Sequence, residues 1–279
     1  MELGLTLFST DRAIDPVRLA REAEARGFYS LYLPEHTHIP VSRRTPPPTG
    51  EEVLAEEYKR TLDPFIALAA AAAVTERIRL GTAVCLMAQR DHVVTAKEVA
   101  TLDRLSGGRF VFGLGFGWNR EEMASHGVDF TQRRQLVREK ILAMKSLWRD
   151  EEASFEGELL KLEPSWAWPK PLQQPTPPLL IGGGAGPKLF GHIVEWADGW
   201  MPIGGSGLSQ ALPLLRRAME EAGRDPGALK VVLIGTLPEE GKLDHYRELG
   251  IDEVALRLPA AGDGEVLAVL DEYARFLLG

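Results

Sequence analysis

Cysteine is almost absent from this chain of 279 residues, because Cys85 is the only one. A single cysteine excludes an internal disulfide and a cysteine-based metal cluster, and within an apolar segment it is expected to be a small buried residue. Long apolar runs are missing too: the longest, residues 65–74, covers ten residues, whereas about 20 are needed to span a bilayer. The N-terminus lacks the basic and apolar stretches of a signal peptide. We therefore expect a soluble, cytoplasmic protein with no membrane partner.

Basic residues are in the minority, since 32 lysines and arginines stand against 40 acidic residues, for a net charge of −8. They gather no further than short pairs such as Arg133-Arg134 and Arg216-Arg217. A nucleic-acid-binding domain usually presents a basic face, so we expect no nucleic-acid partner. An anionic ligand would have to be held by local geometry rather than by the overall field.

Short apolar strands alternate with amphipathic helices from one end of the chain to the other. Helices begin at Asp15-Pro16 and Asp63-Pro64, where a capping aspartate precedes a proline suited to the first helical position. Eight strand-then-helix units indicate an α/β fold, a single (β/α)8 TIM barrel spanning residues 1–279, with a doubly wound sheet as the alternative. The predicted strands are 3–8, 28–33, 78–84, 109–114, 179–181, 199–202, 229–234 and 253–258.

Two segments are too long to be ordinary connections of such a barrel. Residues 37–58 follow the second strand and are rich in proline and threonine, which indicates a lid or binding loop. Residues 153–178 lie between the fourth helix and the fifth strand, and predict a hairpin followed by a proline-rich linker. Because ligands bind at the C-terminal ends of barrel strands, we expect both insertions to shape a pocket there.

A carboxylate and a histidine directly follow the second strand, in Pro34-Glu35-His36-Thr37-His38. Histidine titrates near neutral pH, so His36 is a candidate general acid or base, and Glu35 is a candidate to orient it or to hold a substrate donor. The alternative is a loop histidine with no role. The His-x-His spacing also suits a metal, but three or four converging ligands are needed. The later strand ends offer glycine and apolar residues instead, so no metal site is expected.

Glycine-rich sequences follow two other predicted strands. The fourth strand leads into Gly113-Leu114-Gly115-Phe116-Gly117-Trp118, which has Trp118 where a dinucleotide fingerprint needs its last glycine. The fifth strand leads into Gly182-Gly183-Gly184, and then into Pro187, suited to a first helical turn, and Lys188. Backbone N–H groups of such turns bind anions, especially at a helix N-terminus. Two of these turns at one barrel mouth predict a phosphate pocket.

Several segments, taken in order, resemble the luciferase-like monooxygenase family, the bacterial luciferase-like oxidoreductases that use flavin or deazaflavin. The resemblance covers nearly the whole chain and is carried by residues 80–84, 96–97, 100–103, 105–109, 113–118, 178–183 and 197–200. Members are (β/α)8 barrels, often homodimers, that bind FMN or the deazaflavin coenzyme F420 at the barrel mouth. The resemblance therefore implies a homodimeric enzyme with one of these cofactors.

The resemblance also implies roles for single residues. It implies a cis peptide between Ala83 and Val84 behind the cofactor ring. The cofactor-binding residues it implies are Ala83, Val84, Gly115, Phe116, Gly117, Trp118, Gly182, Gly183 and Gly184. Pro34-Glu35-His36 resembles the acidic–histidine pair of the deazaflavin branch, which makes His36 the proton donor or acceptor beside the ring. The loop arginines available for the anionic tail of deazaflavin are Arg43, Arg44 and Arg120.

The segment after the second strand favours the deazaflavin branch, and hence hydride transfer between F420 and a small organic substrate. The sugar-phosphate dehydrogenases of that branch carry a glutamate where this chain has Trp118, which indicates a more apolar substrate. Two alternatives remain. One is an FMN-dependent monooxygenase that uses reduced flavin and O2, with a separate cofactor-reducing enzyme as partner. The other is a non-catalytic flavin-binding barrel.

Overall fold

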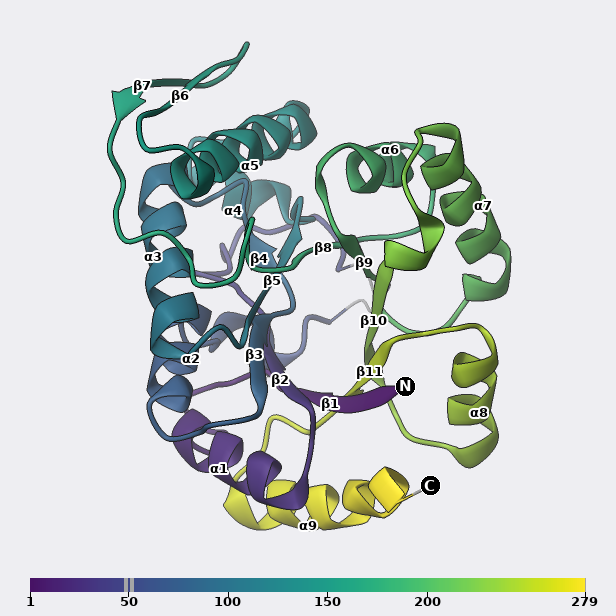
Figure 1. Cartoon of the computed structure of the whole chain (residues 1–279). Helices are drawn as coiled ribbons and strands as arrows, with labels where there is room; N and C mark the ends of the chain where they lie inside the picture. Colours follow the sequence, from purple (N-terminus) through teal and green to yellow (C-terminus); the bar gives the residue numbers. More distant parts are fainter. Residues whose placement is uncertain (48–49, 51–52, 279) are drawn as a thin grey trace.

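A closed barrel of parallel strands forms the centre of the molecule and confirms the predicted fold (Figure 1). The structure, a computed structural model, describes residues 1–47, 50 and 53–278. Because β3 pairs with β5 as well as with β2, the two ends of the strand order meet and the sheet closes on itself. In order around the barrel, the strands are β1 (Glu2–Thr6), β2 (Ser30–Leu33), β3 (Arg79–Thr82), β5 (Phe110–Gly115), β8 (Leu179–Gly182), β9 (Gly199–Met201), β10 (Lys230–Thr236) and β11 (Glu253–Arg257).

Helices cover the outside of the barrel (Figure 1). They are α1 (Pro16–Arg26), α2 (Pro64–Ala72), α3 (His92–Leu105), α4 (Arg120–Ser125), α5 (Arg133–Arg149), α6 (Pro187–Trp196), α7 (Leu208–Glu221), α8 (Glu240–Glu248) and α9 (Asp263–Tyr273). Three single turns accompany them, η1 (Glu56–Lys59), η2 (Pro226–Ala228) and η3 (Ala274–Leu278). The side chains of Asp15, Asp63 and Asp91 cap α1, α2 and α3, because their carboxylates accept hydrogen bonds from first-turn N–H groups. Among the helices of the described ranges, none is long and apolar enough to cross a membrane.

The third strand differs from its prediction. It ends as β3 at Thr82 and resumes as β4 (Cys85–Leu86), which pairs with β5. Between the two pieces, the Ala83–Val84 peptide bond is cis, as the resemblance implied. The short helix α4 was not predicted at all, since its six residues are too few to show a helical period.

A second core fills the inside of the barrel, separate from the large apolar layer between strands and helices. Tyr32 is the largest side chain of this inner core and is buried. It fits only because Gly81 has no side chain: a Cβ there would lie 2.5 Å from the Tyr32 ring and 2.8 Å from the carbonyl oxygen of Val111. Gly81 is therefore part of a tightly packed barrel interior.

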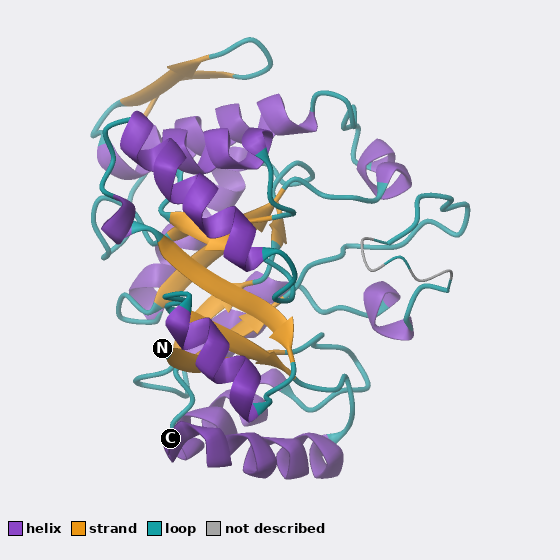
Figure 2. Cartoon of the chain, turned by 90° about the vertical axis from the view of Figure 1, so that its right-hand side faces the viewer, coloured by secondary structure: helices purple, strands orange, loops and turns teal. Residues whose placement is uncertain are grey.

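The two predicted insertions leave the barrel at different places. The hairpin β6 (Ala153–Glu156) and β7 (Lys161–Ser165) projects beyond the helices (Figure 2). The carboxylate of Glu139 on α5 holds its turn by accepting hydrogen bonds from the N–H groups of residues 158–160. The described parts of the other insertion, residues 37–47 and 53–58, extend from the end of the barrel where the strands finish (Figure 2). Within it, residues 48–49 and 51–52 lie outside the described residues.

Candidate active site

One cavity of about 590 Å³ opens at the C-terminal ends of the strands. All nine residues predicted to bind the cofactor line it, so the structure brings together Ala83-Val84, residues 115–118 and residues 182–184. They converge because parallel strands all finish at the same end of the barrel. Sequence reasoning missed the rest of the lining, namely Leu86, Arg133, Arg134, Ala185, Trp200, Met201, Pro202, Ile203, Gly204, Ser206 and Ile234.

Val84 and two glycines shape the floor of this cavity. A Cβ at Gly115 would lie 2.7 Å from one methyl of Val84, and a Cβ at Gly182 would lie 2.7 Å from the other. Gly117 has a positive φ of 79°, and a Cβ there would collide with Met123. These three positions have no room for a side chain, because Val84 or Met123 already fills the space that a Cβ would take.

Two arginines give the cavity a cationic side. Arg133 and Arg134 occupy the first turn of α5, where the helix dipole already disfavours positive charge. That turn contains no acidic residue, and its N-cap, Gln132, makes no capping hydrogen bond with its side chain. The Nε of Arg133 and the Nη1 of Arg134 are buried without a hydrogen-bond partner among the described residues. Burial lowers the pKa of both guanidinium groups. An anion in the cavity would lie against both arginines at the N-terminus of α5, where negative charge is favoured.

The cations named from the sequence do not line the cavity. Arg120 stacks over Phe130 at 4.3 Å from the ring centroid, and Arg43 lies 5.9 Å from the centroid of Trp118. The backbone N–H of Arg44 donates to Glu121. Lys188 is exposed on α6. The signal that could have found Arg133 and Arg134 is two adjacent arginines opening a helix, against the usual preference for acidic residues there.

His36 lies beside the cavity and is buried. Its Nδ1 lies 2.8 Å from Oε2 of Glu122, a fully buried residue of α4. The ring also packs against Trp118 at 5.7 Å between centroids and against Tyr58 at 5.3 Å. Trp118 lines the cavity, so it connects His36 with the ligand space. Within the described ranges, Nε2 of His36 has no hydrogen-bond partner.

Glu35 does not lie where the sequence predicted it, beside the ring of His36. Its carboxylate accepts hydrogen bonds from Nε of Arg90 at 2.6 Å and from the backbone N–H of Leu86 at 2.7 Å. It therefore braces β4 and does not contact His36. Successive side chains of an extended chain point to opposite sides, which explains why the carboxylate in contact with His36 comes from Glu122 and not from Glu35.

His38 and His126 lie with ring centroids 5.4 Å apart, on the outer side of α4. Their ring nitrogens contact hydroxyl groups: His38 reaches Ser125 and Thr37, and His126 reaches Thr37. Among the described residues, no group of three or more histidine, cysteine, aspartate or glutamate side chains could hold a metal ion.

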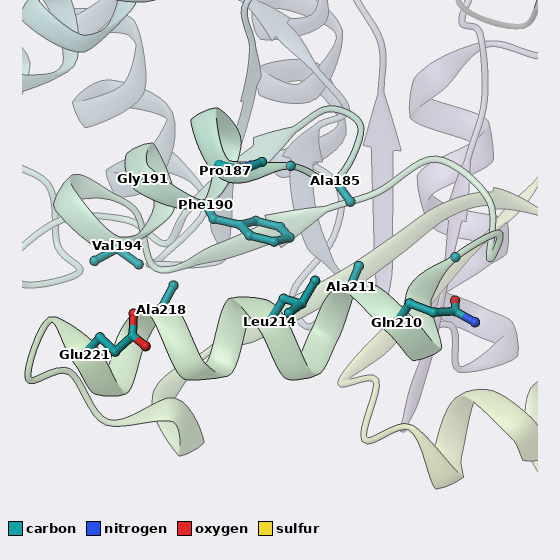
Figure 3. A pocket seen from close by; sticks show the side chains of 12 residues that line it. Ala185, Pro187, Phe190, Gly191, Val194, Gln210, Ala211, Leu214, Ala218 and Glu221 are labelled. Carbon is teal, nitrogen blue, oxygen red and sulfur yellow. The ribbon is translucent and has the colours of Figure 1, made fainter.

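A second cavity, of about 620 Å³, lies between α6 and α7 on the outside of the barrel (Figure 3). Its walls are largely apolar, with Phe190 and Val194 from α6 facing Leu214 and Ala218 from α7 (Figure 3). Ala185 lines both this cavity and the one at the barrel mouth. The candidate active site is the mouth cavity, because it is lined by Arg133 and Arg134, each with a buried nitrogen that lacks a partner among the described residues, and lies beside the buried histidine.

The luciferase-like monooxygenase family matches residues 7–237. The chain belongs to this family. A protein of Mycobacterium tuberculosis with no characterised activity is 44% identical over 277 residues, 98% of each chain. The F420-dependent glucose-6-phosphate dehydrogenase of Kineococcus radiotolerans is 34% identical over 166 residues, which are 57% of this chain and 48% of that enzyme.

Solved structures share the fold at low identity. The monooxygenase RslO1 from Streptomyces bottropensis superposes with a TM-score of 0.82 at 21% identity, covering 100% of this chain and 99% of that one. An F420-dependent secondary alcohol dehydrogenase, in complex with an F420–acetone adduct, gives 0.78 at 18% identity and covers 98% and 97%. The family thus includes enzymes named for F420 and enzymes named as monooxygenases, and luciferase-like oxidoreductase or monooxygenase is the class to which this chain is assigned.

Proposed function

We propose that this protein is an F420-dependent oxidoreductase that transfers hydride between the deazaflavin and a small, apolar organic substrate. The observation that carries the proposal is the mixed lining of one cavity. It is lined by glycine backbones and by Arg133 and Arg134, each of which has one buried nitrogen without a partner among the described residues. It is also lined by Trp118, whose ring packs against His36. This arrangement suits a cofactor with an anionic chain and a reactive ring that works beside a proton donor.

The residues of the cavity fit such a cofactor. Its phosphate and carboxylated tail would be held by Arg133, Arg134 and the backbone N–H groups of residues 182–184, since buried donors without partners favour a charged acceptor. Its ring would lie against Ala83–Val84, where glycines 115 and 182 leave the floor flat. When bound, F420 supplies a hydride donor or acceptor, which no side chain can replace.

His36 supplies the proton that accompanies hydride transfer. A carbonyl that accepts a hydride at carbon needs a proton at oxygen, and an alcohol that loses a hydride must release one. The lining of the cavity includes the apolar or aromatic side chains of Leu86, Trp118 and Ile203. The acidic group that sugar-phosphate dehydrogenases of the family carry is replaced by Trp118. A ketone, an enone or a secondary alcohol suits this wall better than a sugar phosphate.

Fluorescence titration of the purified protein with F420 and, in parallel, with FMN tests the proposal. We expect F420 to bind more tightly than FMN, and reduced F420 to be consumed when enones, imines or ketones are added. Tight binding of FMN alone, with O2 consumption, would replace the proposal by the monooxygenase. Binding of F420 without turnover of any of these substrates would favour a non-catalytic flavin-binding barrel. Binding of neither would contradict the phosphate pocket itself.

A further inference from the structure

The carboxylate of Glu122 is an unusual group within the described part of the chain. The residue is fully buried, and Oε2 meets Nδ1 of His36 at 2.8 Å. The other oxygen, Oε1, is buried without a hydrogen-bond partner among the described residues. Removing a carboxylate from water is costly unless its oxygens are satisfied. A carboxylate that keeps one oxygen unpaired therefore calls for a functional explanation.

Other buried carboxylates of the molecule are saturated. Glu35 uses one oxygen for Arg90 and the other for the N–H of Leu86. Glu139 accepts from Gln135 and from three backbone N–H groups. Asp103 likewise uses both oxygens, for the backbone and side chain of Gln173 and the N–H of Leu172. Each of these groups ties segments of backbone together, whereas the carboxylate of Glu122 accepts from His36 alone.

The position of Glu122 in α4 would normally give its carboxylate a different hydrogen-bond partner. Asn119 caps α4 with its side chain, so Glu122 is the third residue of the first turn. A glutamate there usually reaches back to the N–H of the capping residue. In this helix the carboxylate turns to His36 instead. The usual role of the position is thus given up for the contact with the histidine.

We propose that Glu122 is a positioning residue for His36. An ionised carboxylate only accepts hydrogen bonds, so it fixes the proton of the neutral imidazole on Nδ1. Nε2 is then the nitrogen that exchanges a proton with the substrate. The same carboxylate stabilises the imidazolium form, as a buried acid does for the histidine of a catalytic triad. The inference deepens the proposed function and rests on it for the identity of the reaction.

The proton balance of the reduction follows from this arrangement. A hydride adds to the carbonyl carbon, and the electron pair of the C=O π bond moves to the oxygen. That oxygen takes the proton from Nε2 of the imidazolium. His36 is then neutral, and its remaining proton stays on Nδ1, hydrogen-bonded to the carboxylate of Glu122. The oxidation of an alcohol runs the same steps backwards. The other groups around His36 are Tyr58 from η1 and Trp118 from the end of β5, with Arg43 over the Trp118 ring. Glu122 is therefore the charged group in direct contact.

Nitrogen-15 NMR of the histidine ring tests the positioning directly, in protein without cofactor. We expect the neutral ring of His36 to carry its proton on Nδ1, although free histidine prefers Nε2. Glu122→Ala should return the ring to the Nε2–H form. The matched control is Glu121→Gln, the neighbouring residue on α4, whose carboxylate binds Thr45 and the N–H of Arg44. This control should leave the tautomer unchanged. An Nε2–H ring in the wild type, or an unchanged ring in Glu122→Ala, would overturn the proposal.

Kinetics supply the second readout. Glu122→Gln keeps the shape of the side chain but offers an amide N–H to Nδ1, which favours the wrong tautomer. We expect kcat to fall by about 10²–10⁴-fold with little change in KM or in F420 affinity. Glu122→Asp should recover part of kcat. Adding Glu122→Gln to His36→Ala should cost little more than His36→Ala alone, because the two act as a unit.

The outcomes separate this inference from the proposed function. If kcat of Glu122→Gln stays within about twofold of the wild type, or if the two substitutions cost independent factors, Glu122 does not act through His36. If the wild type turns over nothing with F420 while NMR shows the Nδ1–H ring, the proposed reaction fails and the positioning stands. Thermal unfolding of each variant identifies any that fail to fold, and if Glu122→Ala is one of them, Glu122→Gln replaces it in the NMR test.

Discussion

The two ends of the barrel are built from the same strands, but they treat their polar groups differently. At the C-terminal end, donors of Arg133 and Arg134 and one oxygen of Glu122 are buried without partners in the described residues. These groups weaken the fold unless a ligand or a reaction uses them. These unpaired groups indicate that the C-terminal end of the barrel serves ligand binding rather than stability.

The N-terminal end pairs most of its polar groups within the protein. Glu253 accepts hydrogen bonds from the hydroxyl groups of Ser30 and Tyr32. A smaller cavity, of about 300 Å³, lies beside this cluster. Nε of Arg79 is the exception there, since it is buried without a described partner. In such barrels, residues at the N-terminal ends of the strands generally serve stability, and residues at the C-terminal ends serve catalysis. The comparison predicts that changes at the two ends separate into effects on binding and effects on stability.

The largest effect is expected from removing both cavity arginines. In the variant Arg133→Ala/Arg134→Ala, two charge-assisted contacts to the cofactor are lost, so F420 affinity should fall by about 10²–10⁴-fold. Its thermal stability should change little, because the helix dipole no longer opposes two cations, which offsets the lost contacts of Arg133 with Phe130 and of Arg134 with Phe116. Fluorescence titration and thermal unfolding measure the two quantities.

The control for this variant lies on the same helix. Arg138 pairs with Glu195 and does not line the cavity, so Arg138→Ala should leave F420 affinity unchanged. Equal losses of affinity in both variants would mean that the effect comes from α5 as a whole and not from the two guanidinium groups.

At the other end, Glu253 should control the pH dependence of stability. Burial raises the pKa of its carboxyl group to about 7. In the unfolded chain the same group has its usual pKa of 4.5. The protonated carboxyl group of Glu253 therefore contributes its full stabilisation below pH 4.5. This contribution, about 3 kcal/mol in all, is lost as pH rises from there through 7. Glu253→Gln should remove this slope, which urea unfolding at about pH 5 and about pH 8 would show. Parallel pH profiles of variant and wild type would contradict the assignment. F420 affinity should not change.

The smallest effect is expected inside the barrel. Gly81→Ala places a methyl group 2.5 Å from the Tyr32 ring and 2.8 Å from a carbonyl oxygen, and should lower the free energy of unfolding by about 1–3 kcal/mol. Gly191→Ala on α6 is the control with the opposite sign, because no atom lies within 4 Å of its Cβ and alanine favours a helix. Destabilisation by both substitutions would show that Tyr32 packing is not the cause.

The fold and the glycines of the cavity could be predicted because they follow local rules, whereas the roles of Ala83, Val84, Phe116 and Trp118 came from the family resemblance. Alternating strands and helices predict the barrel, and parallel strands place the glycines after β5 and β8 at the same end. The cis bond at Ala83–Val84 came from the family resemblance and not from such a rule.

The remaining site residues depend on contacts that no local rule describes. Sequence reasoning paired His36 with Glu35, its neighbour in the chain, whereas the structure pairs it with Glu122, which is 86 residues away. As the third residue of a capped helix, Glu122 looks like an ordinary capping residue. Arg133 and Arg134 look like a solvated pair until the structure places them against the cavity. In each case the sequence favours an ordinary structural role, and only the folded chain shows the contact with His36 or with the cavity.

The most direct test of the account is a crystal structure of the protein with F420 bound. We predict that the ring lies against Ala83–Val84 with Trp118 and His36 at its side. We also predict that the phosphate or the tail accepts hydrogen bonds from Arg133, Arg134 and the glycines 182–184. A cofactor bound elsewhere, or bound in the cavity while both guanidinium groups remain unpaired, would contradict the account.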